Sequence, residues 1–255
     1  MTDNTTKQAL FEYVLRLGEN ALINGQRLSE WCGHGPFLEE DVSAANTALD
    51  LIGRSRMLLT YAGELEGKGR SEDDLAYMRD EREWHNFLIM ELPKKDFGFT
   101  MVRQFLNDAY NFYLYQALQE SADETLAGIA AKVVKESAYH VRHTGEWVIR
   151  FGDGTEESHA RAQAALDDVW PYVEEMFETD DIDRAIIQAG MGPDPDAIKA
   201  QWNDRINAVL EEATLKRPGD VWQQRGGRQG LHTEHMGYLL AEMQSVQRAH
   251  PGQQW

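Results

Sequence analysis

One stretch, residues 132–150, constrains the fold of this 255-residue chain more than any other. Its apolar residues recur at the spacing of an amphipathic helix, with charged residues between them: Val133, Val134, Ala138, Val141, Trp147 and Val148. Glu136 and His140 lie on the same apolar side of that helix. A carboxylate and an imidazole in this position are typical of a metal site inside a helical bundle, where the histidine follows the glutamate by three residues.

In this chain the histidine follows by four residues. Residues three or four apart still share one face of a helix, but a shift of one residue turns a side chain by about 100° around the axis. The stretch therefore has the outline of a carboxylate metal site with one ligand displaced.

The rest of the chain is also helical in pattern, because no strand alternation of useful length and no internal repeat is present. Apolar periodicity and glycine or proline breaks predict helices over residues 6–31, 38–65, 71–92, 99–121, 123–151, 155–177, 181–189, 196–215 and 233–249. Ser71, followed by Asp74, predicts a capped start for the third of these. We expect an all-α chain forming one domain over residues 1–255, with a core bundle at about 38–151 and peripheral helices over 6–31 and 155–249.

The composition of the chain indicates which kinds of partner it can bind and in which cellular compartment it is expected. The chain has 25 basic and 43 acidic residues, a net charge of −18, so it would be repelled by nucleic-acid phosphates and by anionic lipid. Its single cysteine, Cys32, excludes an internal disulfide framework. With no signal-peptide pattern and no run of eighteen apolar residues, we expect a cytoplasmic protein that binds neither nucleic acid nor membrane.

Four of the predicted helices each carry an acidic residue near the middle: Asp50, Glu81 (or Asp80), Asp108 and Glu136. One internal carboxylate per helix is typical of dimetal carboxylate bundles, in which two helices also supply a histidine three residues after the acid. Here Trp84 follows Glu81 by three residues, and Tyr139 follows Glu136 by three. The pattern favours a degenerate pocket held by hydrogen bonds and ion pairs, and an intact dimetal site is the alternative.

Other candidate ligands have weaker sequence support. Glu156 and His159 have the Glu-x-x-His spacing but lie at a helix start without a second copy. For His232 and His235, near a glycine-rich loop, we predict a capping and surface role. Trp255, at the end of a glutamine-rich tail, is a candidate docking residue for another chain.

Several segments resemble one known family, the C subunits of bacterial 1,2-phenylacetyl-CoA epoxidases. The similarity covers nearly the whole chain and is most specific near the C-terminus. The segments that carry it are Leu15-Arg-Leu-Gly-Glu19, Gln26-Arg-Leu-Ser-Glu-Trp-Cys-Gly-His34, Ala45-Asn-Thr-Ala-Leu-Asp-Leu-Ile-Gly53, Arg79-Asp-Glu-Arg82, Lys135-Glu-Ser-Ala-Tyr-His140, Gly230-Leu-His-Thr-Glu-His235, Leu240-Ala-Glu-Met-Gln244 and Pro251-Gly-Gln-Gln-Trp255.

The resemblance implies a ferritin-like helical bundle with additional C-terminal helices and a place in aerobic phenylacetate degradation. In such multicomponent monooxygenases, a related A subunit holds the di-iron centre, a B subunit links the components, and a reductase delivers electrons from NADPH. The assembly epoxidises the ring of phenylacetyl-CoA with dioxygen. The C subunit is the metal-free structural partner of A, so we expect no cofactor and no catalytic residue in this chain, and self-association is possible when it is isolated.

The resemblance also assigns roles to the candidate residues. The degenerate pocket becomes a structural pseudo-site formed by Asp50, Glu81, Asp108, Glu136 and His140. A CoA ester could use side chains with stacking, amide or cationic groups, and the candidates are Glu83, Trp84, His85, Asn86 and Arg184. Core packing and surface ion pairing are the alternative roles for these residues. Two other functions stay open: a dimetal oxidase that is active alone, and a helical interaction module.

Overall fold

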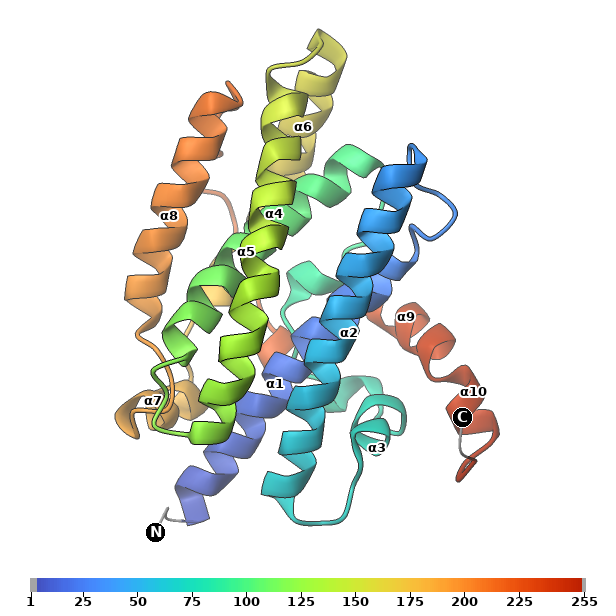
Figure 1. Cartoon of the computed structure of the whole chain (residues 1–255), viewed down its shortest axis with the longest axis vertical. Coiled ribbons are helices and arrows are strands. Elements are labelled where there is room, and N and C mark those ends of the chain that lie inside the picture. Colours follow the sequence, from blue (N-terminus) through green and yellow to red (C-terminus); the bar gives the residue numbers. More distant parts are fainter. Residues whose placement is uncertain (1–3, 254–255) are drawn as a thin grey trace. The chain divides into compact units, whose positions relative to one another are not determined.

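The computed structural model describes residues 4–253, and every regular element in that range is helical, as the sequence predicts (Figure 1). Contacts between residues group the chain into two compact units. Unit 1 comprises the chain up to Pro93 together with the chain from Arg225 onward, and unit 2 comprises Lys94–Gln224. Unit 1 is thus built from both ends of the chain. The prediction of one domain with its core at 38–151 stays a prediction, and Trp255 lies outside the described residues.

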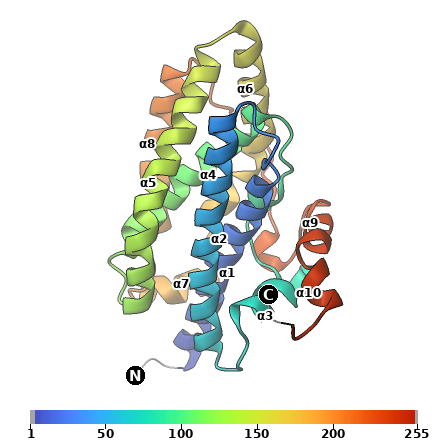
Figure 2. The same cartoon turned by 45° about the vertical axis from the view of Figure 1, so that its right-hand side comes forward.

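Two long antiparallel helices, α1 (Asn4–Ser29) and α2 (Leu38–Glu66), form the body of unit 1 (Figures 1 and 2). Glycines allow them to pack closely. A Cβ atom on Gly25 of α1 would lie 3.2 Å from Cγ1 of Ile52 and 3.3 Å from the carbonyl oxygen of Ala48 on α2. The helix α2 ends at Gly67, which adopts the left-handed conformation (φ 70°) that glycine accepts without steric cost.

The predicted helix over 71–92 is wrong beyond its first turns. The capping box at Ser71 and Asp74 forms as expected, but α3 covers only Glu72–Tyr77. Two 3-10 turns follow, η1 (Glu81–Glu83) and η2 (Leu88–Glu91), joined by extended backbone.

Side chains of α1 explain why this segment is not helical. The backbone N–H of His85 donates to Oε2 of Glu19 (2.7 Å), and that of Phe87 donates to Oδ1 of Asn20 (2.8 Å). These carboxylate and amide oxygens replace the carbonyl acceptors that a helix would supply.

The C-terminal part of unit 1 packs against this irregular segment. Gly230 has a φ of 70°, and a Cβ atom there would lie 2.5 Å from the carbonyl oxygen of Arg82. The predicted helix over 233–249 begins later, as α9 (Met236–Met243), and is interrupted before α10 (Ser245–Ala249). It begins late because the N–H of Thr233 donates to Glu91 (2.8 Å), and at the interruption the side chain of Gln244 donates to the carbonyl oxygen of Arg79 (3.0 Å).

In unit 2, α4 (Phe97–Leu118) is the central helix, and it packs against α5 (Glu124–Gly152), α6 (Glu156–Val169) and α8 (Pro195–Glu212). The indole Nε1 of buried Trp202 in α8 donates to the carbonyl oxygen of Leu106 in α4 (2.8 Å). A short helix, α7 (Asp181–Gln188), precedes α8.

The predicted helix over 155–177 is wrong at its C-terminal end, since α6 stops at Val169 and two 3-10 turns, η3 (Trp170–Tyr172) and η4 (Glu174–Phe177), follow. Pro171 accounts for this, because it has no N–H to donate to the preceding turn of the helix.

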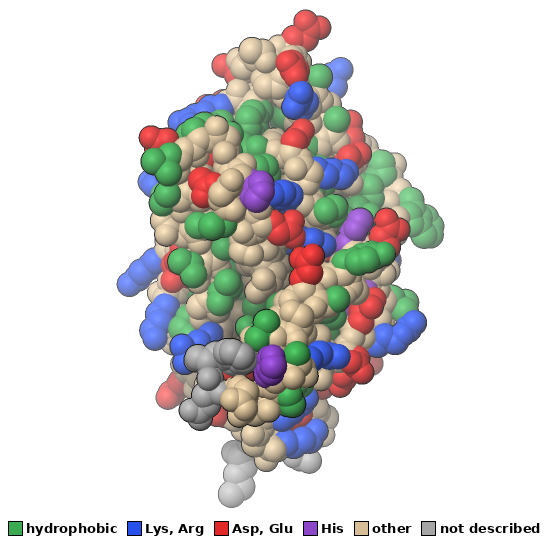
Figure 3. Space-filling model, turned by 90° about the vertical axis from the view of Figure 1, so that its right-hand side faces the viewer, with side chains coloured by type: hydrophobic (Ala, Val, Ile, Leu, Met, Phe, Trp, Pro, Cys, Tyr) green, Lys and Arg blue, Asp and Glu red, His purple; other side chains and the backbone are tan. Residues whose placement is uncertain are grey.

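None of the described helices combines the length and the apolar run that crossing a membrane requires. Acidic, basic and hydrophobic side chains are intermixed over the face drawn in Figure 3.

Candidate functional site

The five residues of the predicted pseudo-site are divided between the two units. Asp50 lies in α2 and Glu81 in the η1 turn, both in unit 1. Asp108 lies in α4, and Glu136 and His140 lie in α5, all in unit 2. Glu81 is exposed and is not part of a long helix, so the expectation of four equivalent acid-bearing helices is wrong. The pseudo-site as a whole stays a prediction.

Within unit 2, Asp108 and His140 are both buried, each with 2% of its surface exposed. Thr144, one turn after His140, places its hydroxyl 3.2 Å from Oδ2 of Asp108 and 2.9 Å from the carbonyl oxygen of His140. The hydroxyl therefore links the acid of α4 to α5. Asp108 also belongs to a row of polar side chains at helical spacing along α4: Gln104, Asn107, Asp108 and Asn111.

The residue three positions after Glu136 is Tyr139, and its side chain faces away from buried Asp108 and His140. Tyr139 is 47% exposed, and its ring stacks on that of His143 at 5.8 Å with 11° between the planes. The buried imidazole is that of His140, four residues after Glu136. The one-residue displacement of the histidine in the sequence therefore corresponds to a different direction of the side chain: Tyr139 is exposed, whereas His140 is buried.

The pseudo-site residues of unit 2 do not have the Glu-x-x-His arrangement of a dimetal carboxylate centre. The carboxylate of Asp108 accepts a hydrogen bond from a hydroxyl, and the residue in the expected histidine position is an outward-facing tyrosine. Over residues 4–253, no group of three or more His, Cys, Asp and Glu side chains is placed so that it could hold a metal ion.

Unit 1 contains a buried polar cluster that the sequence does not reveal. Glu91, fully buried, accepts four hydrogen bonds. Its Oε1 receives Nδ1 of His232 (2.7 Å) and Nδ2 of Asn86 (3.0 Å). Its Oε2 receives the N–H (2.8 Å) and the hydroxyl (2.7 Å) of Thr233. Four donors on two oxygens match an ionised carboxylate.

Both ring nitrogens of His232 face acceptors in this cluster. Its Nδ1 faces the carboxylate, and its Nε2 lies 3.0 Å from the carbonyl oxygen of Trp84, an arrangement that suits a protonated imidazole. Burial lowers the pKa of His232, but the hydrogen bond and the negative charge of Glu91 outweigh burial, and the net effect raises that pKa above its usual value. The two residues form a buried ion pair.

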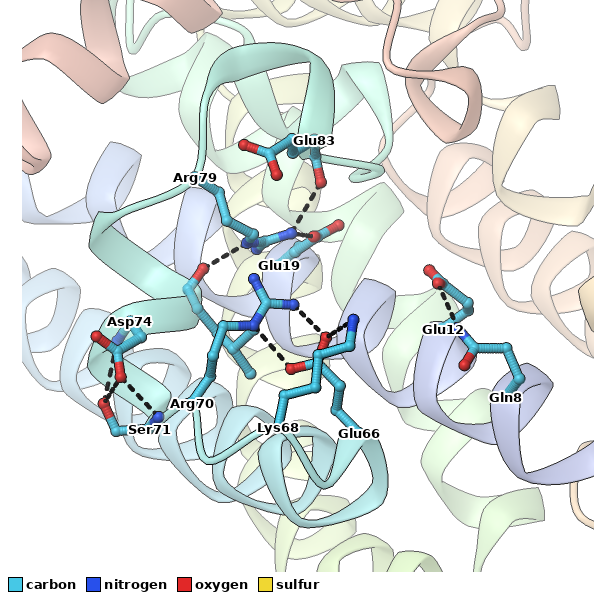
Figure 4. A network of polar contacts seen from close by, with 11 residues as sticks. Gln8, Glu12, Glu19, Glu66, Lys68, Arg70, Ser71, Asp74, Arg79 and Glu83 are labelled. Atoms are coloured by element: carbon cyan, nitrogen blue, oxygen red, sulfur yellow. Dashed lines mark hydrogen bonds and ion pairs between the residues drawn. The ribbon is translucent and has the colours of Figure 1, made fainter. Parts of the chain in front are cut away.

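A second buried ion pair, between Glu19 and Arg79, lies in the same unit (Figure 4). Nε of Arg79 donates to the carbonyl oxygen of Leu75 (2.6 Å), and Nη1 donates to that of Glu83 (2.8 Å). The guanidinium carbon lies 4.5 Å from the ring centroid of Trp84. Together the two ion pairs replace helical hydrogen bonding in the irregular segment.

The predicted surface role of His232 is wrong, because its side chain is fully buried. The side chain of His235 is 35% exposed, which agrees with the predicted surface position, but the predicted capping role is wrong, because this side chain makes no capping hydrogen bond at the start of α9. The one local signal for the cluster is Glu91 itself, an acid within the apolar run Phe87–Leu92. Its partner lies 141 residues later, so no spacing rule could have paired them.

The predicted substrate residues differ in exposure. Trp84 and Asn86 are fully buried, His85 is half-buried and Glu83 is exposed. Arg184, in unit 2, forms an exposed ion pair with Asp181 (2.6 Å). None of the five lines the cleft of about 240 Å³ in unit 1 beside Glu81 and Arg248, or the cleft of about 380 Å³ in unit 2 between Ser121 and the start of α8. Their role toward a CoA ester stays a prediction.

Comparison with known proteins gives the fold and the family. A solved structure of a protein with aldehyde deformylating oxidase activity from Synechococcus matches with a TM-score of 0.60 at 17% identity, covering 84% of this chain and 95% of its own. The chain therefore has the ferritin-like helical fold. It is 46% identical over 246 residues to the C subunit of 1,2-phenylacetyl-CoA epoxidase from Escherichia coli K12, covering 96% of this chain and 99% of that relative. The model of the phenylacetic acid catabolic protein family matches residues 1–255, and the chain belongs to that family.

Proposed function

We propose that this chain is a non-catalytic structural subunit of a multicomponent monooxygenase that epoxidises phenylacetyl-CoA. In the proposal it stabilises and positions a related A subunit, which holds the di-iron centre. A B subunit and a reductase that uses NADPH complete the assembly. The identity with an epoxidase C subunit over almost the full length of both chains supports the choice of assembly.

One observation supports the non-catalytic role most directly. In α5 the position that should hold a metal-binding histidine holds Tyr139, which faces outward, while Asp108 is bonded to Thr144. An active di-iron centre in this fold needs inward carboxylates and histidines at fixed spacing. The orientation of Tyr139 in α5 therefore supports a subunit that keeps the bundle without binding the metal.

The direct test is elemental analysis of the isolated chain after expression in iron-replete medium. We expect well below one iron per chain and no iron-dependent consumption of dioxygen. Two tightly held irons per chain would contradict the proposal and favour an oxidase that is active without a partner.

A second measurement tests the assignment to an assembly. Co-expression with the products of neighbouring reading frames should yield a stable complex with a ferritin-like chain that has intact Glu-x-x-His motifs. That complex should bind iron and epoxidise phenylacetyl-CoA when reductase and NADPH are supplied. If the chain binds no such partner, the result would contradict the proposal and favour a helical interaction module that acts in another assembly.

A further inference from the structure

The C-terminal part of unit 1 contains a strap, defined here as residues 230–248, which includes α9 and α10 (Figure 2). The strap is attached at two places to a much earlier part of the chain, at sequence separations from 141 to 171 residues. At the first attachment, His232 and Thr233 bond Glu91 of the irregular segment. The second attachment lies at the end of α3.

The second attachment supplies hydrogen-bond donors to backbone carbonyl groups. Nε2 of Gln244 lies 3.2 Å from the carbonyl oxygen of Ala76 and 3.0 Å from that of Arg79. Arg248 donates from Nε to the carbonyl oxygen of Tyr77 (3.1 Å) and from Nη2 to that of Arg79 (2.7 Å). The last carbonyl groups of a helix have no partner within it, so these donors cap α3.

The strap has little stability of its own. α9 has 8 residues and α10 has 5, and isolated helices shorter than about 12–15 residues are marginal in water. The buried apolar side chains of α9 are those of Met236, Leu239 and Leu240. Segments with few buried apolar contacts open at a lower free energy than the core. Detaching the strap should therefore require less free energy than unfolding α1 and α2.

His232 is a titratable group at the first attachment, and its contacts suit the charged form. Nδ1 faces Oε1 of Glu91, and Nε2 faces the carbonyl oxygen of Trp84. A neutral imidazole has one N–H, so loss of the proton would turn a nitrogen lone pair toward one of these oxygens. Glu91 would keep its other donors, Asn86 and Thr233, and with them a reason to stay ionised. Deprotonation therefore weakens the attachment at the imidazole.

Other charges act on the imidazole from the elements around it. Glu91 in η2 and Glu81 in η1 both raise the pKa of His232, whereas burial lowers that pKa. On the strap itself, the neighbouring side chains of Glu234 and His235 are 86% and 35% exposed. Water and salt screen charges in such positions. The protonation of His232 is therefore set mainly by the irregular segment to which the strap is attached.

From these contacts we infer that the strap is a pH-operated latch, which detaches from the irregular segment when His232 loses its proton while α1 and α2 stay folded. Detachment uncovers the buried apolar side chains of α9. It also opens the cleft of about 240 Å³, whose lining includes Glu81 from the irregular segment and Arg248 from the strap. The latch follows from the contacts within unit 1 and does not depend on the proposed function.

Hydrogen–deuterium exchange of the full-length chain measures detachment of the strap. Protection factors are compared, because they are corrected for the pH dependence of exchange in an unfolded chain. The amides of Leu239 and Gln244, which donate hydrogen bonds within the strap, are compared with amides of α1 and α2. Between about pH 6 and about pH 9, protection of the strap should fall at least about threefold more than that of α1 and α2. Equal falls in both would mean that unit 1 opens as a whole, and they would overturn the inference.

Two variants separate titration from general loosening. His232→Gln cannot titrate, so protection of its strap should depend on pH no more than that of α1 and α2. The matched control, Arg248→Gln, removes donors at the second attachment and leaves His232 in place. It should lower protection of the strap at every pH and keep the fall with rising pH. A fall that persists in His232→Gln, or that disappears in Arg248→Gln, would overturn the latch. If His232→Gln holds the strap too weakly to be measured, the comparison within the unaltered chain decides the question.

Discussion

Nδ1 of His232 lies 2.7 Å from Oε1 of Glu91, although 141 residues separate them in the sequence. Both side chains are fully buried, so the ion pair connects the C-terminal part of unit 1 to its irregular segment. A buried ion pair of this kind stabilises the fold only while both partners keep their charges.

The stability of unit 1 should therefore depend on pH through His232. Its pKa is raised in the folded chain, since the attraction of Glu91 exceeds the effect of burial. The stabilisation is complete below the unfolded-state pKa of about 6.5 and is lost as pH rises through the higher folded-state pKa. The groups that raise this pKa are Glu91, the carbonyl oxygen of Trp84 and Glu81. Asn86 and Thr233 donate hydrogen bonds to Glu91.

Urea unfolding at a series of pH values measures this effect. As the pH rises above the unfolded-state pKa of about 6.5, the unaltered chain should lose stability relative to His232→Gln, because only the histidine can lose a charge. The variant cannot ionise and supplies the control. Parallel pH profiles for the two proteins would show that folding does not raise the pKa of His232.

Arg79→Met should be strongly destabilising. The substitution leaves the carboxylate of Glu19 buried without its cation, because Glu19 is 0% exposed. Removing one partner of a buried pair typically costs about 3–5 kcal/mol. The measurement is the free energy of unfolding in urea.

The matched control is Arg184→Met, which removes a cation from an ion pair whose side chains are 60% and 98% exposed. Exposed pairs contribute little, so its unfolding midpoint should stay where it is. Similar losses in the free energy of unfolding for both variants would mean that the Glu19–Arg79 pair is not stronger because it is buried.

Two glycine-to-alanine substitutions in α2 should have opposite effects. At Gly53 the new Cβ has open space, and replacing a mid-helix glycine should stabilise the isolated chain by about 0.5–1 kcal/mol. At Gly63 the new Cβ would lie 2.4 Å from the carbonyl oxygen of Arg70, and overpacking should cost about 1–3 kcal/mol. Thermal unfolding of both variants checks the signs, and a shift of both in one direction would contradict the local geometry.

Thr144→Val tests the link between α4 and α5. The change keeps the shape of the side chain but removes the hydroxyl 3.2 Å from Oδ2 of Asp108, which should cost about 0.5–1.5 kcal/mol, the net contribution of a typical hydrogen bond. Thr60→Val is the control, because the Thr60 hydroxyl also bonds the carbonyl oxygen one turn earlier (2.8 Å) but is exposed. The difference between the two losses measures the contact with Asp108, and equal losses would exclude it.

The sequence predicts the long helices well because their signals are local. The predicted spans 38–65 and 123–151 correspond to Leu38–Glu66 and Glu124–Gly152. Amphipathic periodicity and, for α5, the side-chain cap of Asp123 determine these limits.

The helical prediction fails over residues 78–91 because their structure depends on distant side chains. Glu19 and Asn20 bind the amides of His85 and Phe87 from more than sixty residues away, at sequence separations of 66 and 67. The sequence of the segment itself does not indicate that distant side chains will bind its backbone amides in place of helical carbonyl groups. The candidate site follows the same rule: the one-residue displacement of His140 is visible in the sequence, whereas the pairing of His232 with Glu91 is not.

The composition of unit 1 from both ends of the chain has a consequence for biosynthesis. A ribosome makes residues 94–224 before it makes His232, so Glu91 emerges long before its counter-ion exists. Unit 2 is one continuous segment, whereas unit 1 stays incomplete until the segment from Arg225 onward has been made. The part of unit 1 that precedes unit 2 in the sequence is therefore completed only after unit 2 has been synthesised.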